Sequence, residues 1–315
     1  MPLAYISDYS WEAIVPIPQD DGGENPLAPI AYQDDYKTAT GYLRAVMSVE
    51  EVSDRALQLT SDLIFMNPAH YSVWAYRARL LFALKKDLEQ ELIWIEEVGQ
   101  RFPKNYQIWN HREMIVDKYD NPIRELPFIE VMLELDSKNY HVWSYRQWLV
   151  RRFDLWITEL PYTDRMIEND VRNNSAWNHR FFTVFGKGVD IAQSEINDEI
   201  DYAKRAILKA PQNASAWNYL LGVLKRAQRP LSEIEEFCND LAAVTTTAQS
   251  LNVDIDRLAS TRALEVLADI YAGRREVEKA AQAWTLLAEK YDPIRENYWK
   301  FKNRRQVSVS WLQPK

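Results

Sequence analysis

Hydrophobic residues recur along this chain at the spacing of a helix with one buried face. Val52, Ala56, Leu59, Leu63 and Met66 follow one another in alternating steps of four and three residues, and this spacing places their side chains on one side of a helix. Comparable patterns cover residues 88–102, 231–245, 261–272 and 276–291. The pattern therefore predicts a chain of amphipathic helices.

A segment centred on tryptophan divides the chain into repeats. The five segments read HYSVWAYR, NYQIWNHR, NYHVWSYR, NNSAWNHR and NASAWNYL, and their tryptophans are Trp74, Trp109, Trp143, Trp177 and Trp217. The spacings between them are 35, 34, 34 and 40 residues, and a degenerate sixth copy, NYWKFKNRR, contains Trp299. A period of this length indicates stacked two-helix units, because a single unit cannot bury its own apolar face.

Proline and asparagine mark the helix boundaries inside each unit. A proline before the segment ends the preceding helix, and an asparagine four residues before the tryptophan is placed to cap the next one. The prolines are Pro68, Pro103 and Pro211, and the asparagines are Asn105, Asn139, Asn173 and Asn213. We therefore expect an all-α fold, in which antiparallel helical hairpins stack into a curved array. Residues 1–45 are predicted to form an extended arm, and residues 46–315 a single repeat domain.

Composition narrows the functional classes. Only 8 of the 315 residues are glycine, which disfavours barrels, sandwiches and nucleotide-binding folds. Seven acidic and no basic residues occur in positions 1–35, and no basic block follows, so nucleic acid is not an expected partner. One cysteine, no long apolar run and no signal peptide predict a cytoplasmic protein without a membrane span.

The repeated residues are expected to be structural. A tryptophan in every repeat most simply fills the space between stacked helices, and the arginine three residues later is predicted to pair with a carboxylate of a neighbouring repeat. The four histidines occupy three different slots of the repeat and no cysteine cluster accompanies them, so no metal site is expected in this chain. The chain by itself does not have the pattern of an enzyme.

The residues at the helix starts suggest a binding surface. The slot three residues before the tryptophan holds Tyr71, Tyr106 and Tyr140 in the first three repeats, and Lys104 lies just outside the helix that Asn105 caps. A helix N-terminus favours an anion, so a lysine and a phenol placed there form a candidate phosphate-binding edge. A solvated rim is the alternative interpretation of the same residues.

These segments closely resemble the α subunit of protein prenyltransferases, above all the subunit shared by farnesyltransferase and geranylgeranyltransferase type I. The match rests on the tandem NYxxWxxR pattern, on DVRNNSAWNHRFF and KNYHVWSYRQW, and on VPIPQDDG at residues 15–22. It runs from about residue 5 to residue 305, and only Leu220 and the degenerate sixth repeat depart from the family pattern. The resemblance implies that tetratricopeptide-like repeats form a right-handed superhelix or crescent of stacked antiparallel helical hairpins. It also implies an obligate heterodimer with a β subunit, and thus an enzyme that transfers a prenyl group.

The resemblance also implies roles for individual residues. Lys104 and Tyr140 match catalytic positions, Lys104 by stabilising the diphosphate leaving group. Other matched positions contact the diphosphate and substrate (Tyr106, Asn139, Tyr140 and His141) or the peptide (Gln107 and Tyr71). The implied substrates are farnesyl or geranylgeranyl diphosphate and CaaX-ending proteins such as Ras-like GTPases. Zinc would be bound by the β subunit, and magnesium would accompany the diphosphate.

Two other functions stay open at this stage. The first is the α subunit of Rab geranylgeranyltransferase, which shares these repeats. The second is a non-catalytic helical-repeat scaffold that presents an aromatic face to another protein.

Overall fold

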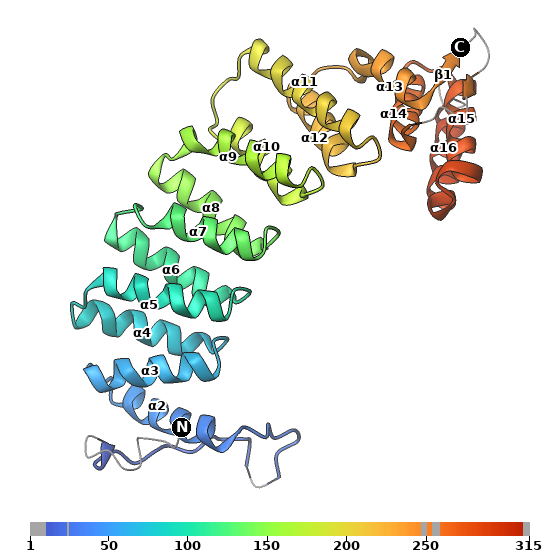
Figure 1. The fold of residues 1–315 in the computed structure, drawn as a ribbon. Helices are drawn as coiled ribbons and strands as arrows, with labels where there is room; N and C mark the ends of the chain where they lie inside the picture. The colour runs from blue at the N-terminus through green and yellow to red at the C-terminus, as the bar shows by residue number, and fades with distance from the viewer. Residues whose placement is uncertain (1–10, 24, 247–250, 254–258, 311–315) are drawn as a thin grey trace. The chain divides into compact units, whose positions relative to one another are not determined.

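The structure is a computed structural model that describes residues 11–23, 25–246, 251–253 and 259–310. It consists of two compact units, Met1–Asp154 and Leu155–Lys315, and each is a succession of helical hairpins (Figure 1). We call them the N-terminal and the C-terminal unit. The sequence predicted one repeat domain over residues 46–315. The boundary between the two units, at Asp154, falls between the third and the fourth tryptophan repeats, and the single repeat domain stays a prediction.

The N-terminal unit contains the first three tryptophan repeats. Its helices are α2 (Asp34–Ser48), α3 (Asp54–Met66), α4 (Tyr71–Ala83), α5 (Leu88–Arg101), α6 (Tyr106–Tyr119), α7 (Glu125–Leu135) and α8 (Tyr140–Phe153). The two helices of each hairpin pack on each other, and the second helices α4, α6 and α8 lie side by side. The predicted order of helix, short turn and helix is confirmed.

The C-terminal unit continues the same pattern and then departs from it. Its α-helices are α9 (Glu159–Asn169), α10 (Asn174–Phe185), α11 (Gln193–Lys209), α12 (Ala214–Arg226), α13 (Glu235–Ala242), α14 (Thr261–Gly273), α15 (Val277–Leu286) and α16 (Glu296–Ser310). The degenerate sixth repeat forms the hairpin of α15 and α16, in which Trp299 is fully buried. Residues 311–315 of the predicted domain lie outside the described residues.

One predicted helix is only partly correct. Residues 231–245 were expected to be helical, but the segment begins as a 3₁₀ turn and α13 ends at Ala242. The next residue, Ala243, has a left-handed backbone with φ of 49°, which cannot continue the helix. A short antiparallel ribbon follows, in which β1 (Val244–Thr246) pairs with β2 (Leu251–Val253). The β-branched residues in β1 favour this extended form.

The asparagine caps form as the sequence predicted. The side chain of Asn105 accepts hydrogen bonds from the backbone N–H of Gln107 (2.9 Å) and of Ile108 (3.4 Å). The same arrangement caps α8 and α10, and at α12 Asn213 accepts the single backbone N–H of Ser215. Each cap satisfies backbone donors that the first helical turn leaves unpaired. The first helical residue of α6 is therefore Tyr106, and Lys104 lies outside the helix.

Each tryptophan of the five repeats is buried and also makes a hydrogen bond to the preceding turn. The indole N–H donates to the carbonyl oxygen six residues earlier in the chain, a bond that the packing argument did not predict. The five pairs are Trp74 with Pro68, Trp109 with Pro103, Trp143 with Ser137, Trp177 with Val171 and Trp217 with Pro211, at 2.8–3.1 Å. Tryptophan thus fixes the turn that precedes its own helix.

The repeated arginines link successive hairpins. The guanidinium of Arg112 donates to both carboxylate oxygens of Glu125, at 2.7 and 2.8 Å, and the hydroxyl of Tyr145 donates to the same carboxylate at 2.7 Å. One glutamate therefore joins α6, α7 and α8. The same arrangement recurs in Arg77–Glu91–His111 and in Arg180–Glu199–Tyr219. The predicted pairing of these arginines with carboxylates is confirmed for Arg77, Arg112 and Arg180.

The N-terminal arm is shorter than predicted. Helix α2 begins at Asp34, so residues 34–45, which were expected to be extended, are helical. Trp11 is buried against Tyr42, with ring centroids 5.2 Å apart, and the N–H of Ile17 donates to the carbonyl of Gly41 at 3.1 Å. The arm therefore packs on α2. Residues 1–10 and 24 of the predicted arm lie outside the described residues.

Candidate functional site

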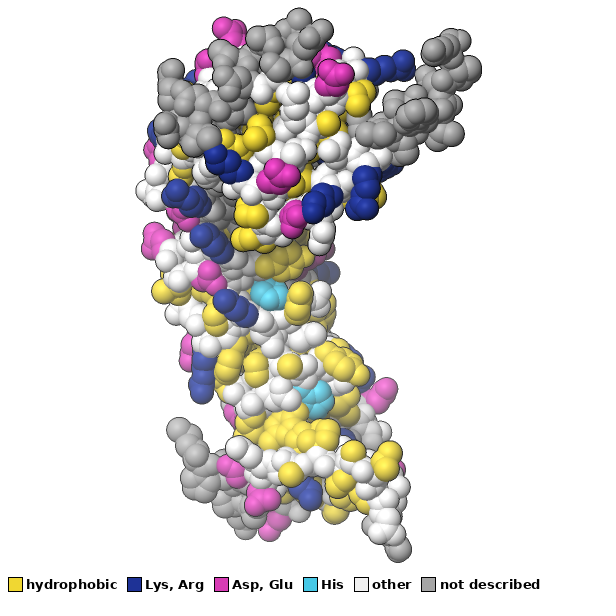
Figure 2. All heavy atoms as spheres, turned by 90° about the vertical axis from the view of Figure 1, so that its right-hand side faces the viewer, with side chains coloured by type: hydrophobic (Ala, Val, Ile, Leu, Met, Phe, Trp, Pro, Cys, Tyr) yellow, Lys and Arg dark blue, Asp and Glu magenta, His cyan; other side chains and the backbone are white. Residues whose placement is uncertain are grey.

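The first residues of α4, α6 and α8 form a row of exposed tyrosines. Tyr71, Tyr106 and Tyr140 are 70%, 67% and 68% exposed, although each stands next to a well-packed helical turn. Figure 2 shows hydrophobic side chains, in yellow, gathered beside histidine side chains, in cyan, on one face of the molecule. Large aromatic side chains repeated at one exposed slot favour contact with a ligand or a partner over a role in folding.

The backbone next to Lys104 is held from two sides. The carbonyl of Pro103 accepts hydrogen bonds from the indole of Trp109 (3.1 Å) and from the side-chain amide of Asn139 (3.0 Å). Trp109 belongs to the same repeat and Asn139 to the next one, so this peptide is fixed within the stack. Lys104 therefore extends from a rigid turn, as a preorganised binding group requires.

The ammonium of Lys104 lies beside a carboxylate that the sequence analysis missed. Its Nζ is 3.0 Å from Oδ2 of Asp136, with side chains that are 71% and 34% exposed. The hydrogen bond from Lys104, together with one from the backbone N–H of Lys138, holds the pKa of Asp136 below its ordinary value. The lysine is thus restrained while most of its surface faces solvent.

Two of the tyrosines converge on His141, the second residue of α8. The ring of Tyr106 meets the imidazole edge-on at a centroid distance of 4.3 Å, and the ring of Tyr140 lies 5.8 Å away. Burial, and then the positive charge of Lys104, lowers the pKa of His141. The imidazole is therefore neutral at pH 7, and it offers a hydrogen bond without adding charge. Lys104, Tyr106, Tyr140 and His141 form one group, which we call the Lys104 edge.

The remaining predicted residues lie around this edge in different ways. Gln107 is half-buried in the first turn of α6, next to Tyr106. Tyr71 stands one repeat away, at the start of α4. Asn139 is only 2% exposed, and its side chain bonds Pro103, His141 and Val142. These bonds position the turn; contact of Asn139 with the substrate stays a prediction from the sequence.

The chemistry available at the Lys104 edge is recognition of an anion. One ammonium, two phenol hydroxyls and a neutral imidazole supply donors near the start of a helix, where the backbone also favours negative charge. Within the described residues, no three side chains of His, Cys, Asp or Glu gather at a position suited to a metal ion. Among those same residues, no helix has the length and apolar character needed to cross a membrane.

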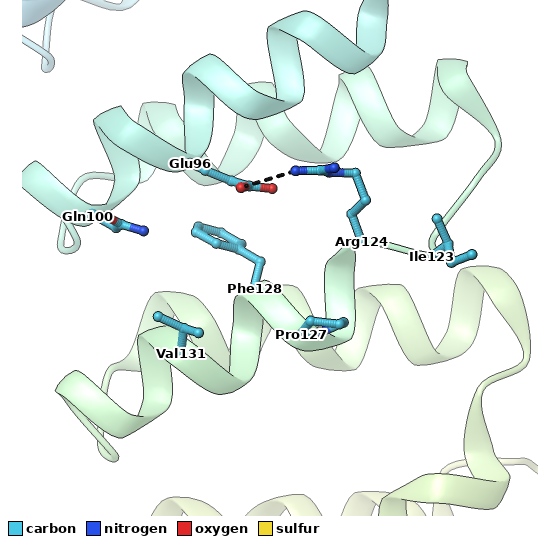
Figure 3. A pocket seen from close by; sticks show the side chains of 7 residues that line it. All are labelled: Glu96, Gln100, Ile123, Arg124, Pro127, Phe128 and Val131. Atoms are coloured by element: carbon cyan, nitrogen blue, oxygen red, sulfur yellow. Dashed lines mark ion pairs between the residues drawn. The ribbon is translucent and has the colours of Figure 1, made fainter.

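A separate groove lies between α5 and α7 (Figure 3). Its volume is about 410 Å³, and its lining includes Ile123, Phe128 and Val131. At one side Arg124 approaches Glu96, with a nitrogen–oxygen distance of 3.5 Å. None of the residues predicted from the sequence as site residues lines this groove, so it is distinct from the Lys104 edge.

Comparison with known families identifies the repeats. The family model described as "Protein prenyltransferase alpha subunit repeat" matches residues 53–84, 88–119, 122–153, 156–185 and 196–227. Each matched span contains one of the five tryptophans on which the repeats were aligned. The repeat assignment made from the sequence is therefore confirmed.

Similar proteins cover nearly the whole chain. The protein farnesyltransferase/geranylgeranyltransferase type-1 subunit alpha of Candida albicans is 40% identical over 314 residues, which are 96% of this chain and 99% of the relative. Its counterpart in Schizosaccharomyces pombe is 55% identical over 226 residues, 71% of this chain and 76% of the relative. A solved structure of Candida albicans protein geranylgeranyltransferase-I complexed with GGPP has a TM-score of 0.85 at 40% identity, covering 95% of this chain and 98% of that chain. This chain therefore belongs to the protein prenyltransferase alpha-subunit family.

Proposed function

We propose that this chain is the α subunit of a heterodimeric CaaX protein prenyltransferase, of the farnesyltransferase or geranylgeranyltransferase type-1 class. The names of the relatives that align over nearly its full length support this proposal. The observation that carries it at the level of the site is the Lys104 edge, a cation and two exposed phenols held on rigid turns. Such an edge lacks a nucleophile and completes a reaction chamber built by a partner.

The reaction requires stabilisation of a leaving group. The thiolate of the CaaX cysteine attacks carbon 1 of the isoprenyl diphosphate, a carbon–sulfur bond forms, and the carbon–oxygen bond to the diphosphate breaks. Negative charge grows on the departing diphosphate, and Lys104 stabilises it. Tyr106, Tyr140 and His141 donate hydrogen bonds to the same group. A fixed cation acts most strongly when the partner excludes water from the site.

The peptide is recognised beside the diphosphate. Gln107, one residue after Tyr106, donates to the C-terminal carboxylate of the CaaX sequence, and Tyr71 lines the pocket for its last residue. Tyr71 belongs to the tyrosine row of the N-terminal unit, and Gln107 borders it. The choice between farnesyl and geranylgeranyl depends on the β subunit, because the isoprenoid chain lies in that polypeptide.

Metal ions belong to the assembled enzyme in this proposal. Zinc, bound by the β subunit, would lower the pKa of the substrate thiol and so supply the nucleophile. Magnesium would accompany the diphosphate. The part of this chain is to position donors around the leaving group. A cytoplasmic location stays a prediction from the sequence.

Co-expression with candidate β subunits tests the proposal. We expect a stable heterodimer with a farnesyltransferase or type-1 geranylgeranyltransferase β subunit, which transfers a labelled prenyl group to a CaaX peptide without an escort protein. Transfer only to a Rab–escort complex, with a type-2 β subunit, would instead identify a Rab geranylgeranyltransferase. Stable binding of a β subunit without transfer in any pairing would favour the scaffold.

A further inference from the structure

The turn at residues 136–139 contacts the neighbouring repeat twice, at the backbone just before Lys104 and at the Lys104 side chain. Asn139 holds the Pro103 carbonyl through its amide, and Asp136 holds the Lys104 ammonium through its carboxylate. The two groups stand at opposite ends of one four-residue turn. The position of the ammonium is therefore set by the next repeat, and not by the repeat to which Lys104 belongs.

The negative charge of Asp136 is not needed to build this turn. Oδ1 of Asp136 accepts the backbone N–H of Lys138 at 3.1 Å, and in the corresponding turn of the fourth repeat Asp170 accepts the N–H of Arg172 at 2.9 Å. Asn67 makes the same bond to the N–H of Ala69 at 3.1 Å in the first repeat. A neutral amide thus serves the turn equally well, and the charge has a separate use.

Exposed ion pairs contribute little to stability. The pair of Lys104 and Asp136 is therefore better explained by its effect on the position of the lysine side chain. A lysine side chain has many rotamers, and fixing it in one position carries an entropic cost. The ammonium has three N–H donors. One is directed to Asp136, and two are left for an anion at the exposed side.

We propose that Asp136 is a positioning residue for Lys104, which orients the ammonium so that its remaining donors meet the diphosphate leaving group. This inference rests on the role proposed above for Lys104. Because the benefit appears as charge grows on the leaving group, it affects kcat more than the KM for the isoprenyl diphosphate.

A double-mutant cycle in the intact heterodimer tests the inference. The four enzymes are the wild type, Asp136→Asn, Lys104→Ala and the double variant, assayed for kcat and KM with a CaaX peptide. Asp136→Asn keeps an acceptor for the turn and removes the charge. We expect it to lower kcat by roughly 3- to 30-fold while the KM for the isoprenyl diphosphate changes less than about 2-fold. In the Lys104→Ala background it should have no further effect.

The matched control is Asp170→Asn, which makes the same chemical change in the corresponding turn of the next repeat. We expect it to have wild-type kcat, and both variants to form heterodimer in normal yield. A wild-type kcat for Asp136→Asn, or an equal loss with and without Lys104, would overturn the inference even if Lys104→Ala is slow. A wild-type rate for Lys104→Ala would overturn the proposed role of Lys104 and this inference with it.

Discussion

The buried pair of Arg112 and Glu125 leads to a quantitative prediction about stability. Neither side chain is exposed to solvent, and two hydrogen bonds of 2.7 and 2.8 Å join them. Glu125→Gln keeps the shape of the side chain but removes the two-bond counter-charge of a buried guanidinium, which is then left with Glu96 alone, at 3.3 Å. Breaking a buried pair in this way costs about 3–5 kcal/mol, which is a large share of the roughly 5–15 kcal/mol that stabilises a domain.

Replacing both charged residues should cost less than breaking the pair. The fifth repeat carries Leu220 at the arginine slot, fully buried, so the fold accommodates an apolar side chain there. Arg112→Leu combined with Glu125→Leu removes both charges. The half-buried Glu96 loses Arg112 but keeps Arg124. The hydroxyl of Tyr145 is left without its acceptor. That loss is about 1–3 kcal/mol, below the cost expected for Glu125→Gln alone.

Urea unfolding of the heterodimer, followed by circular dichroism and tryptophan fluorescence, measures these differences. The reasoning requires that the double variant be more stable than Glu125→Gln. A double variant that is less stable than Glu125→Gln would refute it, as would a single variant that unfolds within about 0.5 kcal/mol of the wild type, the range of neutral surface changes.

Three further predictions concern single side chains. Trp109→Ala should lower the free energy of unfolding by about 3–5 kcal/mol because it empties a buried site; Trp109→Phe should lose less in the same urea titration, and equal losses would contradict the packing role. Burial lowers the pKa of His111 below its ordinary value near 6.5, so protons bind more readily to the unfolded chain. Stability should therefore fall as the pH drops below about 6.5. The fall should be less steep in His111→Tyr, which carries the residue found at this slot in other repeats. An equal dependence of stability on pH in the two proteins, measured by urea titration, would contradict this prediction. Tyr140→Phe should leave thermal stability unchanged because Tyr140 is 68% exposed, but should slow prenyl transfer; an unaltered rate would remove its hydroxyl from the site.

The sequence predicted the repeats and their helix boundaries well, because local rules determine them. The tryptophan period, the prolines and the asparagine caps each depend on a few neighbouring residues. Asn105 as a cap is enough to place Tyr106 at the first helical position and Lys104 outside the helix.

The contacts between repeats were harder to predict. The pairing of Lys104 with Asp136 joins residues that are 32 positions apart, and nothing in either local pattern selects that partner. A signal existed in the shared spacing of Asp136 to Asn139 and of Asp170 to Asn173, which marks an acid three residues before the cap. The ribbon after Ala243 was missed because its short strands lie at the end of a helical pattern.

The most direct test of the account is the turnover number of the heterodimer that carries Lys104→Ala, measured with a CaaX peptide at saturating isoprenyl diphosphate. The loss of one charge-stabilising group should lower it by roughly 10- to 1000-fold, with a normal yield of heterodimer. Wild-type turnover in an intact heterodimer would contradict the claim that this chain supplies the cation for the leaving group.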